Sequence, residues 1–320
     1  MTDQSEGKDD FNLKTIKLPL FLKKHWPLIL LAFILLFGFY LRSYHLDYPA
    51  VGYHNWKETH YLTEARNFER NGFFDNGFFI PQKSWSGLGF TQDGLHADTF
   101  PITSILAGIM FIFFGFELWA ARLPGLLLNA GTIIFIYLLV KRLFDREDLA
   151  LVSAFLFAIN PLYVFFSHNV QLMNPAIFCM IASAYFFVVW SESLQRKHLF
   201  WAVSFLTIAT LAKYSFFVIV LPIAAILPWK KLLTKQSLIE QWKNYAISIA
   251  IFALVPLWVL YNELVLSTSI SNQTRVVGNL VFQKAWWNMF KIYTMDNLTI
   301  FGLWLSLVGL VFLILFLRKK

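Results

Sequence analysis

Residues 26–41 read WPLILLAFILLFGFYL, an uncharged apolar run that begins just after Lys23 and Lys24 and ends at Arg42. A helix of roughly 20 apolar residues spans the hydrocarbon core of a bilayer, and about 17 suffice. Eight more uncharged stretches of this character follow at 101–116, 123–140, 149–166, 170–190, 199–212, 214–229, 244–262 and 297–317. Because the backbone must satisfy its own hydrogen bonds in lipid, we expect them to be helices. The sequence therefore predicts an all-α, polytopic membrane protein with about nine spans.

The composition excludes several other classes of protein. Apolar residues make up 58% of the chain and charged residues only 14%, whereas a soluble domain carries about 25% charged residues. A disordered chain, a disulfide scaffold and an ordinary soluble enzyme are therefore excluded. The net charge of +8 comes from basic residues beside the apolar runs, such as Lys141–Arg142 and Lys230–Lys231. This pattern is typical of anchors at a membrane surface and does not indicate nucleic-acid binding.

The distribution of Lys and Arg predicts a topology in which residues 1–25 are a cytoplasmic tail and residues 26–320 a membrane domain. Outer loops are expected at 42–100 and 263–296, and basic inner loops at 141–148, 191–198 and 229–243. One conflict remains in this scheme. If 101–116 and 123–140 both cross the membrane, the basic loop 141–148 falls outside. Either one of these two stretches crosses only partly, or the charge rule fails there.

The predicted outer loop 42–100 differs chemically from the rest of the chain, because it holds four of the seven histidines and many acids and aromatic residues. Within it, residues 54–66 have helical spacing that places His54, Glu58 and Tyr61 on one face. His54 and Glu58 suit an acid–base pair or a metal site, and a solvated surface helix is the alternative. Farther along are His96 and Asp98. Asp98 precedes Pro101 by three residues, where it fits either a helix cap or a base at the membrane boundary.

Three further polar features lie at the ends of the predicted spans. Glu117 and Arg122 are expected to pair with each other at a membrane boundary. His168 and Asn174 either reach a site on loop 42–100 or hydrogen-bond to each other. Lys213 is a lone cation between two apolar runs, and we interpret it as a snorkelling anchor.

In this order, the motifs resemble those of lipid-carrier-dependent glycosyltransferases of the C-type membrane fold, the family 39 type that includes protein mannosyltransferases and aminoarabinose transferases. The family motif Asp-Glu-Ala-x-Tyr-x-x-x-Ala-Arg aligns with residues 57–66, where Glu58, Tyr61, Ala65 and Arg66 match and Lys57 replaces the Asp. Residues 54–58 also resemble the His-Asn-Trp-Arg-Gln of a prokaryotic subgroup.

The likeness continues after the loop and covers roughly residues 26–190. Residues 99–101 align with a Pro-containing family motif, with Asp98 as the nearest acid, and Arg122-Leu-Pro124 matches the family's Arg-Leu-Pro. Where the family has an Asp before a proline, this chain has Asn174 before Pro175. The match at residues 99–101 implies a catalytic acid, Asp98, at the start of 101–116. Asn174 is a departure from the family.

The resemblance implies inverting transfer of a sugar from a polyprenyl-phosphate donor to a glycan, lipid or protein acceptor. The site would face outward from a multi-pass protein of a prokaryotic plasma membrane. The implied catalytic acids are Asp98, which we favour as the base, and Glu58. The implied substrate-binding residues are His54, Lys57, Tyr61, Arg66, His96 and Arg122. A divalent metal site on His54 and Glu58 is a further alternative. Two other functions also remain as alternatives, a non-catalytic assembly or binding protein and a transporter.

Overall fold

The computed structural model describes residues 20–52, 55–74, 79–80, 99–265 and 280–318. This part of the chain is helical and contains no strand. Its helices are α1 (Leu20–Ser43), α2 (Asn55–Asn71), α3 (Ile102–Phe114), α4 (Leu118–Phe144), α5 (Glu147–Ile159), α6 (Pro161–Ser167), α7 (Met173–Ser193), α8 (Arg196–Ala212), η2 (Tyr214–Ile219), α9 (Val220–Ile226), α10 (Trp229–Leu232), α11 (Lys235–Phe252), α12 (Leu254–Val265) and α14 (Lys284–Arg318). The prediction of an all-α polytopic membrane protein is confirmed.

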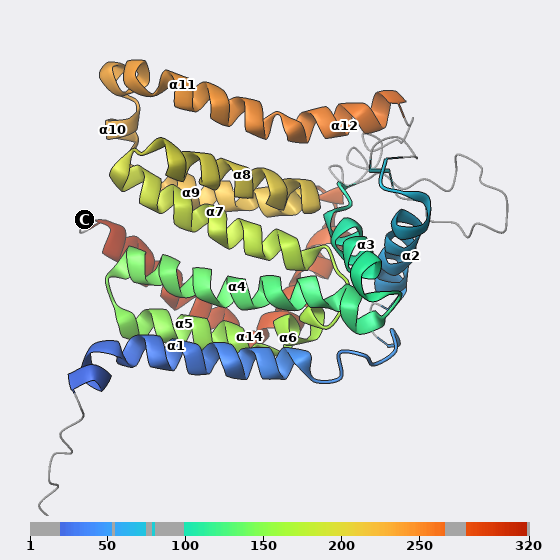
Figure 1. Cartoon of the computed structure of the whole chain (residues 1–320). Helices are drawn as coiled ribbons and strands as arrows, with labels where there is room; N and C mark the ends of the chain where they lie inside the picture. The colour runs from blue at the N-terminus through green and yellow to red at the C-terminus, as the bar shows by residue number, and fades with distance from the viewer. Residues whose placement is uncertain (1–19, 53–54, 75–78, 81–98, 266–279, 319–320) are drawn as a thin grey trace, which may run out of the picture.

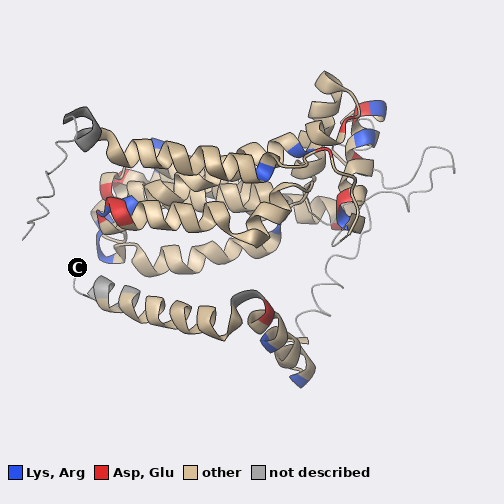
Figure 2. Ribbon diagram, turned by 90° about the horizontal axis from the view of Figure 1, so that it is seen from below, with Lys and Arg blue, Asp and Glu red and all other residues tan. Residues whose placement is uncertain are grey.

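The long helices lie side by side as a bundle, and α2 and α3 lie together at one end of it (Figure 1). We call this the α2 end. The start of α1 and the α4–α5, α7–α8 and α9–α11 connections lie at the opposite end (Figure 1). Charged residues gather at the two ends, whereas the helices between them are largely uncharged (Figure 2). This distribution is the one expected of a bundle that spans a bilayer.

Helix α3 resolves the conflict in the predicted topology. It has 13 residues and is therefore about 20 Å long at 1.5 Å per residue, too short to cross about 30 Å of hydrocarbon. The prediction of a full span at 101–116 is wrong, because the helix ends at Gly115, whose φ of 77° is favourable for glycine. The chain thus crosses the bundle once between α2 and the 145–146 turn, in α4.

The span count is also lower than the nine predicted. Among the described residues, four helices are long and apolar enough to cross a membrane, or six if two bent pairs each count as one span. One bent pair is α5 and α6, which meet at 58°. The break falls at Asn160–Pro161, because proline cannot continue the helical ladder. Asn160 Oδ1 instead accepts hydrogen bonds from two N–H groups that begin α6.

The break leaves carbonyl groups at the end of α5 without a partner in the helix. Arg42, at the end of α1, donates hydrogen bonds to them. Its side chain is fully buried. Its Nη1 donates to the carbonyl oxygens of Gly38 and Ala158, over 3.0 and 2.7 Å, and its Nη2 donates to that of Phe157 over 3.2 Å. The end of α1 is thereby attached to the end of α5.

The core of the bundle is made largely by α4, α7 and α8, which meet through small side chains. A Cβ on Gly131 of α4 would lie 2.6 Å from Phe178 of α7, so these two helices approach closely. Helix α14 contributes little to this core. It bends by 94° near Thr299, where φ is 58°, and its large apolar side chains are mostly exposed.

Candidate functional site

At the α2 end, Glu58 of α2 forms a buried ion pair with Arg122 of α4. The guanidinium binds both carboxylate oxygens, with Nε donating to Oε1 over 2.8 Å and Nη2 donating to Oε2 over 2.9 Å. Glu58 is 1% exposed and Arg122 3%. A bidentate, hydrogen-bonded pair is the arrangement in which charged groups tolerate burial.

The same pair holds two connecting segments in place. Arg122 Nη1 donates to the carbonyl oxygens of Leu46 and Tyr48, over 2.8 and 2.7 Å. Glu58 Oε1 also accepts the N–H of Val170 over 3.0 Å. The α1–α2 connection, α2, α4 and the α6–α7 connection therefore meet at one pair of side chains.

This geometry bears on the partners and roles expected for both residues. The expected partner of Arg122 was Glu117, which is wrong because Glu117 lies exposed before α4 while Arg122 is buried against Glu58. Both oxygens of Glu58 already accept hydrogen bonds. These contacts favour a structural role for Glu58 over proton transfer or metal binding.

A second buried carboxylate lies nearly two turns farther along α2. Glu64 is 1% exposed. It accepts a hydrogen bond of 2.5 Å from Ser104 Oγ of α3, and its Oε1 lies 2.8 Å from His60 Nε2. Neither His60 nor Glu64 was predicted as a site residue, although their i, i+4 spacing was a signal for such a pair.

Three other residues of the α2 motif make packing contacts. Tyr61 and Ala65 are buried between α2 and α3, and a Cβ on Gly108 would lie 3.0 Å from the Ala65 carbonyl oxygen. The guanidinium of Arg66 lies 6.0 Å from the centre of the Phe116 ring. Burial, and then the nearby charge of Arg70, lower the pKa of Arg66. The motif therefore packs α2 onto α3.

An apolar groove of about 400 Å3 opens at the same end of the bundle. We call it the Leu211–Trp258 groove. It is lined by residues 79 and 100, by the end of α8 and by α12, namely Phe79, Phe100, Leu211, Leu254, Leu257, Trp258 and Tyr261. Phe100 is held there by a hydrogen bond of 3.0 Å from its N–H to the Leu211 carbonyl and by a T-shaped ring contact of 4.8 Å with Trp258. The volume falls in the range of small-molecule sites.

Three of the predicted site residues, His54, His96 and Asp98, lie outside the described residues. The structure brings Glu58 and Arg122 together and places Lys57, Tyr61 and Arg66 on the same helix, α2. Among the described residues, no group of three or more His, Cys, Asp or Glu side chains is arranged to hold a metal ion.

The family model for dolichyl-phosphate-mannose-protein mannosyltransferases matches residues 98–260, slightly more than half of the chain. The chain belongs to this family. It is therefore a multi-pass membrane glycosyltransferase that uses a lipid-linked sugar donor and an acceptor. No curated protein sequence matches the chain.

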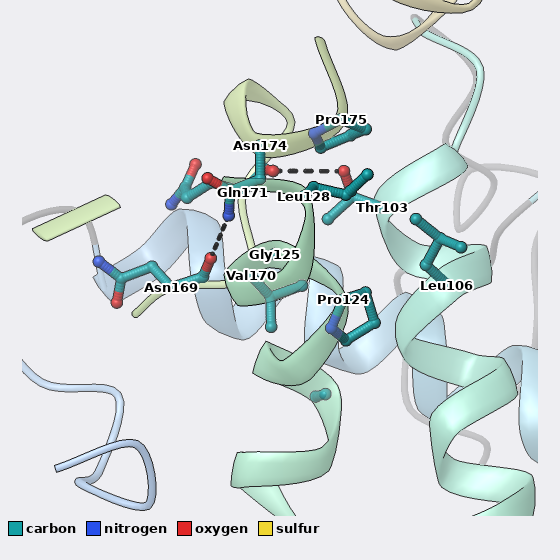
Figure 3. Close-up of a pocket in the computed structure, with 11 residues that line it drawn as sticks. Thr103, Leu106, Pro124, Gly125, Leu128, Asn169, Val170, Gln171, Asn174 and Pro175 are labelled. Carbon is teal, nitrogen blue, oxygen red and sulfur yellow. Dashed lines mark hydrogen bonds between the residues drawn. The ribbon is translucent and has the colours of Figure 1, made fainter. Parts of the chain in front are cut away.

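In this mannosyltransferase-family chain, Asn174 replaces an Asp of the family motif and belongs to a buried amide network (Figure 3). Its Oδ1 accepts a hydrogen bond of 2.9 Å from Asn129 of α4. Its Nδ2 donates to the carbonyl oxygens of Phe166 and Asn169, over 3.2 and 3.0 Å. The adjoining cavity of about 10 Å3 has room for about one water and none for a sugar. Asn174 therefore joins α4 to the α6–α7 connection.

His168 does not contact Asn174 through a hydrogen bond. Its Nε2 lies 3.0 Å from the carbonyl oxygen of Leu41, at the end of α1. Burial is the main cause that lowers the pKa of His168, and the charges of Arg122 and Arg42 lower it further. His168 is therefore a neutral contact between α1 and the end of α6 near neutral pH.

Proposed function

We propose that this family member transfers a sugar from a polyprenyl-phosphate donor to an acceptor hydroxyl, with inversion at the anomeric carbon, at the α2 end of the bundle. The observation that carries the proposal is the Leu211–Trp258 groove, because an apolar groove of about 400 Å3 suits part of an isoprenoid chain. The motif residues of α2 and α4 lie at the same end of the bundle as this groove.

The basic connections between helices support an orientation of the protein in the membrane. Basic residues occur at the α4–α5 connection (Lys141, Arg142 and Arg146) and in α10 (Lys230 and Lys231). Both elements lie at the end opposite α2 (Figure 1). The positive-inside rule assigns such connections to the cytoplasm. The α2 end then faces outward, and acceptors on the outer side of a prokaryotic plasma membrane would reach it.

For the chemistry, we assign Asp98 as the base. Its carboxylate would take the proton of the acceptor hydroxyl while the oxygen attacks the anomeric carbon. The bond between that carbon and the phosphate oxygen breaks, and its electron pair leaves with the polyprenyl phosphate. Support comes from the sequence, because Asp98 precedes by two residues Phe100, which lines the groove.

In this proposal, Glu58 and Arg122 are positioning residues that hold α2 and its flanking segments near the groove. Their buried and mutually satisfied charges support this assignment. Lys57, Tyr61 and Arg66 remain candidates for substrate contact through α2. A metal is not needed for this step, because phosphate is a leaving group that departs without strong protonation.

The test is transfer from radiolabelled polyprenyl-phosphate sugars, in membranes from cells that express the chain. We expect transfer by the wild type and its loss in Asp98→Asn at unchanged abundance. Asp145→Asn is the matched control, because Asp145 lies at the opposite end with a φ of 54°, which asparagine also adopts. Full transfer by Asp98→Asn would disprove the assignment of the base. No transfer by the wild type across a broad panel of donors would favour a non-catalytic binding protein.

A further inference from the structure

Helix α14 consists of two parts that meet at a sharp bend. Its first part, Lys284–Asp296, makes an angle of 94° with its second part, Thr299–Phe312. The second part has a start of its own, because Thr299 has a positive φ of 58° and its Oγ1 accepts the N–H of Gly302 over 3.3 Å. A threonine that accepts an N–H three residues ahead begins a helix. The first part is therefore a separate helix, which we call the 284–296 segment.

The second part of α14 has the length of a membrane crossing. The helix continues from the bend to Arg318, and about 20 residues at 1.5 Å each give about 30 Å, the thickness of the hydrocarbon core. This part ends opposite the α2 end, whereas the 284–296 segment lies nearer the α2 end and is turned across the long helices (Figures 1 and 2). The bend therefore falls where the hydrocarbon ends, and a helix at right angles to the crossing runs along the membrane surface there.

The 284–296 segment has a polar face and an aromatic face. Each face follows the i, i+4, i+7 spacing of an α-helix. The lysine stripe consists of Lys284, Asn288 and Lys291, and the aromatic stripe of Trp286, Phe290 and Tyr293. At about 100° per residue, the centres of the two stripes lie about 160° apart around the helix. The segment is therefore amphipathic, with two positive charges opposite three aromatic rings.

The bundle leaves most of both stripes exposed. The side chains of the lysine stripe are exposed, and Phe290 and Tyr293 are 52% and 60% exposed. The rings of Trp286 and Phe290 stack on each other at 5.4 Å. Trp and Tyr are enriched at the headgroup level of a membrane, because their rings are apolar at one end and polar at the other. Lysines on the opposite face complement the negative charge of lipid phosphates.

We propose that the 284–296 segment lies flat in the headgroup layer of the leaflet at the α2 end, and that its partner is the phospholipid surface. The aromatic stripe inserts about 5–10 Å, to the boundary between headgroups and acyl chains. The lysine stripe faces the lipid phosphates. This inference goes beyond the proposed function and does not depend on it, because the bend and the two stripes involve neither the donor nor the acceptor.

The test measures the depth of spin labels in the full chain, reconstituted in vesicles of phosphatidylethanolamine and phosphatidylglycerol. A cysteine is introduced at one stripe position at a time, and collisions of its nitroxide label with oxygen and with a water-soluble nickel chelate report its depth. The matched controls are Ile300→Cys, Trp304→Cys and Leu307→Cys, which have the same spacing and are exposed on the second part of α14. The wild type, labelled in parallel, measures any reaction at the buried Cys179.

We expect the three labels of the aromatic stripe to lie at one shallow depth and to be less accessible to the nickel chelate than those of the lysine stripe. Between Ile300 and Leu307, the depth should change by about 10 Å, at 1.5 Å per residue. The same change along the aromatic stripe would overturn the inference, because the segment would then cross the membrane. Equal access of the nickel chelate to both stripes would overturn it by placing the segment in water. Dipolar broadening on the aromatic stripe that disappears on dilution with unlabelled chain would overturn it by showing that a second copy covers this face.

A second measurement tests the two lysines separately from the aromatic rings. With the label at Phe290→Cys, we expect a greater depth in vesicles that contain phosphatidylglycerol than in vesicles of phosphatidylcholine alone, because the anionic lipid attracts the lysines. Lys284→Gln with Lys291→Gln should remove this difference. Lys230→Gln with Lys231→Gln, on α10 at the opposite end, is the matched control and should keep it. A difference that persists without Lys284 and Lys291 would overturn their role at the lipid phosphates.

Discussion

The ion pair of Glu58 and Arg122 gives the sharpest prediction, which concerns Glu58→Gln. The substitution leaves a nearly buried guanidinium without a counter-charge, while its contacts to two backbone carbonyls persist. Breaking a buried pair from one side costs about 3–5 kcal/mol. Because the amide oxygen still accepts one hydrogen bond, we expect a loss of about 2–4 kcal/mol in the free energy of unfolding.

The assay is the thermal unfolding of the purified chain in detergent, followed by size-exclusion chromatography. At a fall of about 2–4 °C for each kcal/mol, the midpoint should fall by about 4–16 °C. Glu192→Gln is the matched control, because Glu192 pairs with Arg142 at a half-exposed position, where ion pairs contribute little. Its midpoint should stay near that of the wild type.

A double variant separates the pair from the single residues. Glu58→Leu with Arg122→Leu should cost less than the sum of the two single substitutions, because neither charge is then left buried alone. Transfer should fall in proportion to the folded protein in Glu58→Gln. An unchanged midpoint together with abolished transfer would refute the structural role and make Glu58 a catalytic residue.

Three other predictions concern contacts at the same end. Gly108→Val should separate α2 from α3 and cost about 1–3 kcal/mol, measured as a lower unfolding midpoint, because even a Cβ would lie 3.0 Å from the Ala65 carbonyl. Asn174→Asp should lower the free energy of unfolding by about 2 kcal/mol, and the midpoint with it, because a carboxylate would face two carbonyl oxygens in place of the donor they now have. For His168, the pKa in the folded state lies below 6.5, so its neutral form stabilises the fold at neutral pH. This contribution is lost as the pH falls through the lowered pKa, and His168→Gln should flatten the decline of the midpoint between about pH 7 and 5.

Each of these predictions has a contrary result. An unchanged midpoint in Gly108→Val would mean that α2 and α3 separate without cost. A more stable Asn174→Asp would show that the family's acid suits this pocket. If wild type and His168→Gln lose stability identically on acidification, His168 does not stay neutral in the folded protein.

The sequence predicted the apolar helices well, because a run such as residues 26–41 has few alternatives to a membrane helix. It did not predict that α3 stops short. The apolar run continues through Phe116, and only the backbone at Gly115, with its positive φ, ends the helix. Hydropathy reports which residues avoid water, whereas the length of a helix also depends on where the chain can turn.

The pairing of Glu58 with Arg122 could not be predicted from the sequence. The family motif pointed to Glu58 and Arg122, but the two lie 64 residues apart in the sequence, and nearby Glu117 was the more obvious partner. Pairings of this kind depend on how helices pack, which no local pattern records.

The contact between Arg42 and the end of α5 has a consequence for biosynthesis. Arg42 leaves the ribosome 116 residues before Ala158, whose carbonyl it binds, so at about 5–20 residues per second roughly 6–23 s separate the two. During that interval the guanidinium has no α5 to bind, and it must stay at the water-facing rim of the translocation channel or bilayer. The end of α1 can therefore reach its final hydrogen-bonded position only after α5 has been synthesised and inserted.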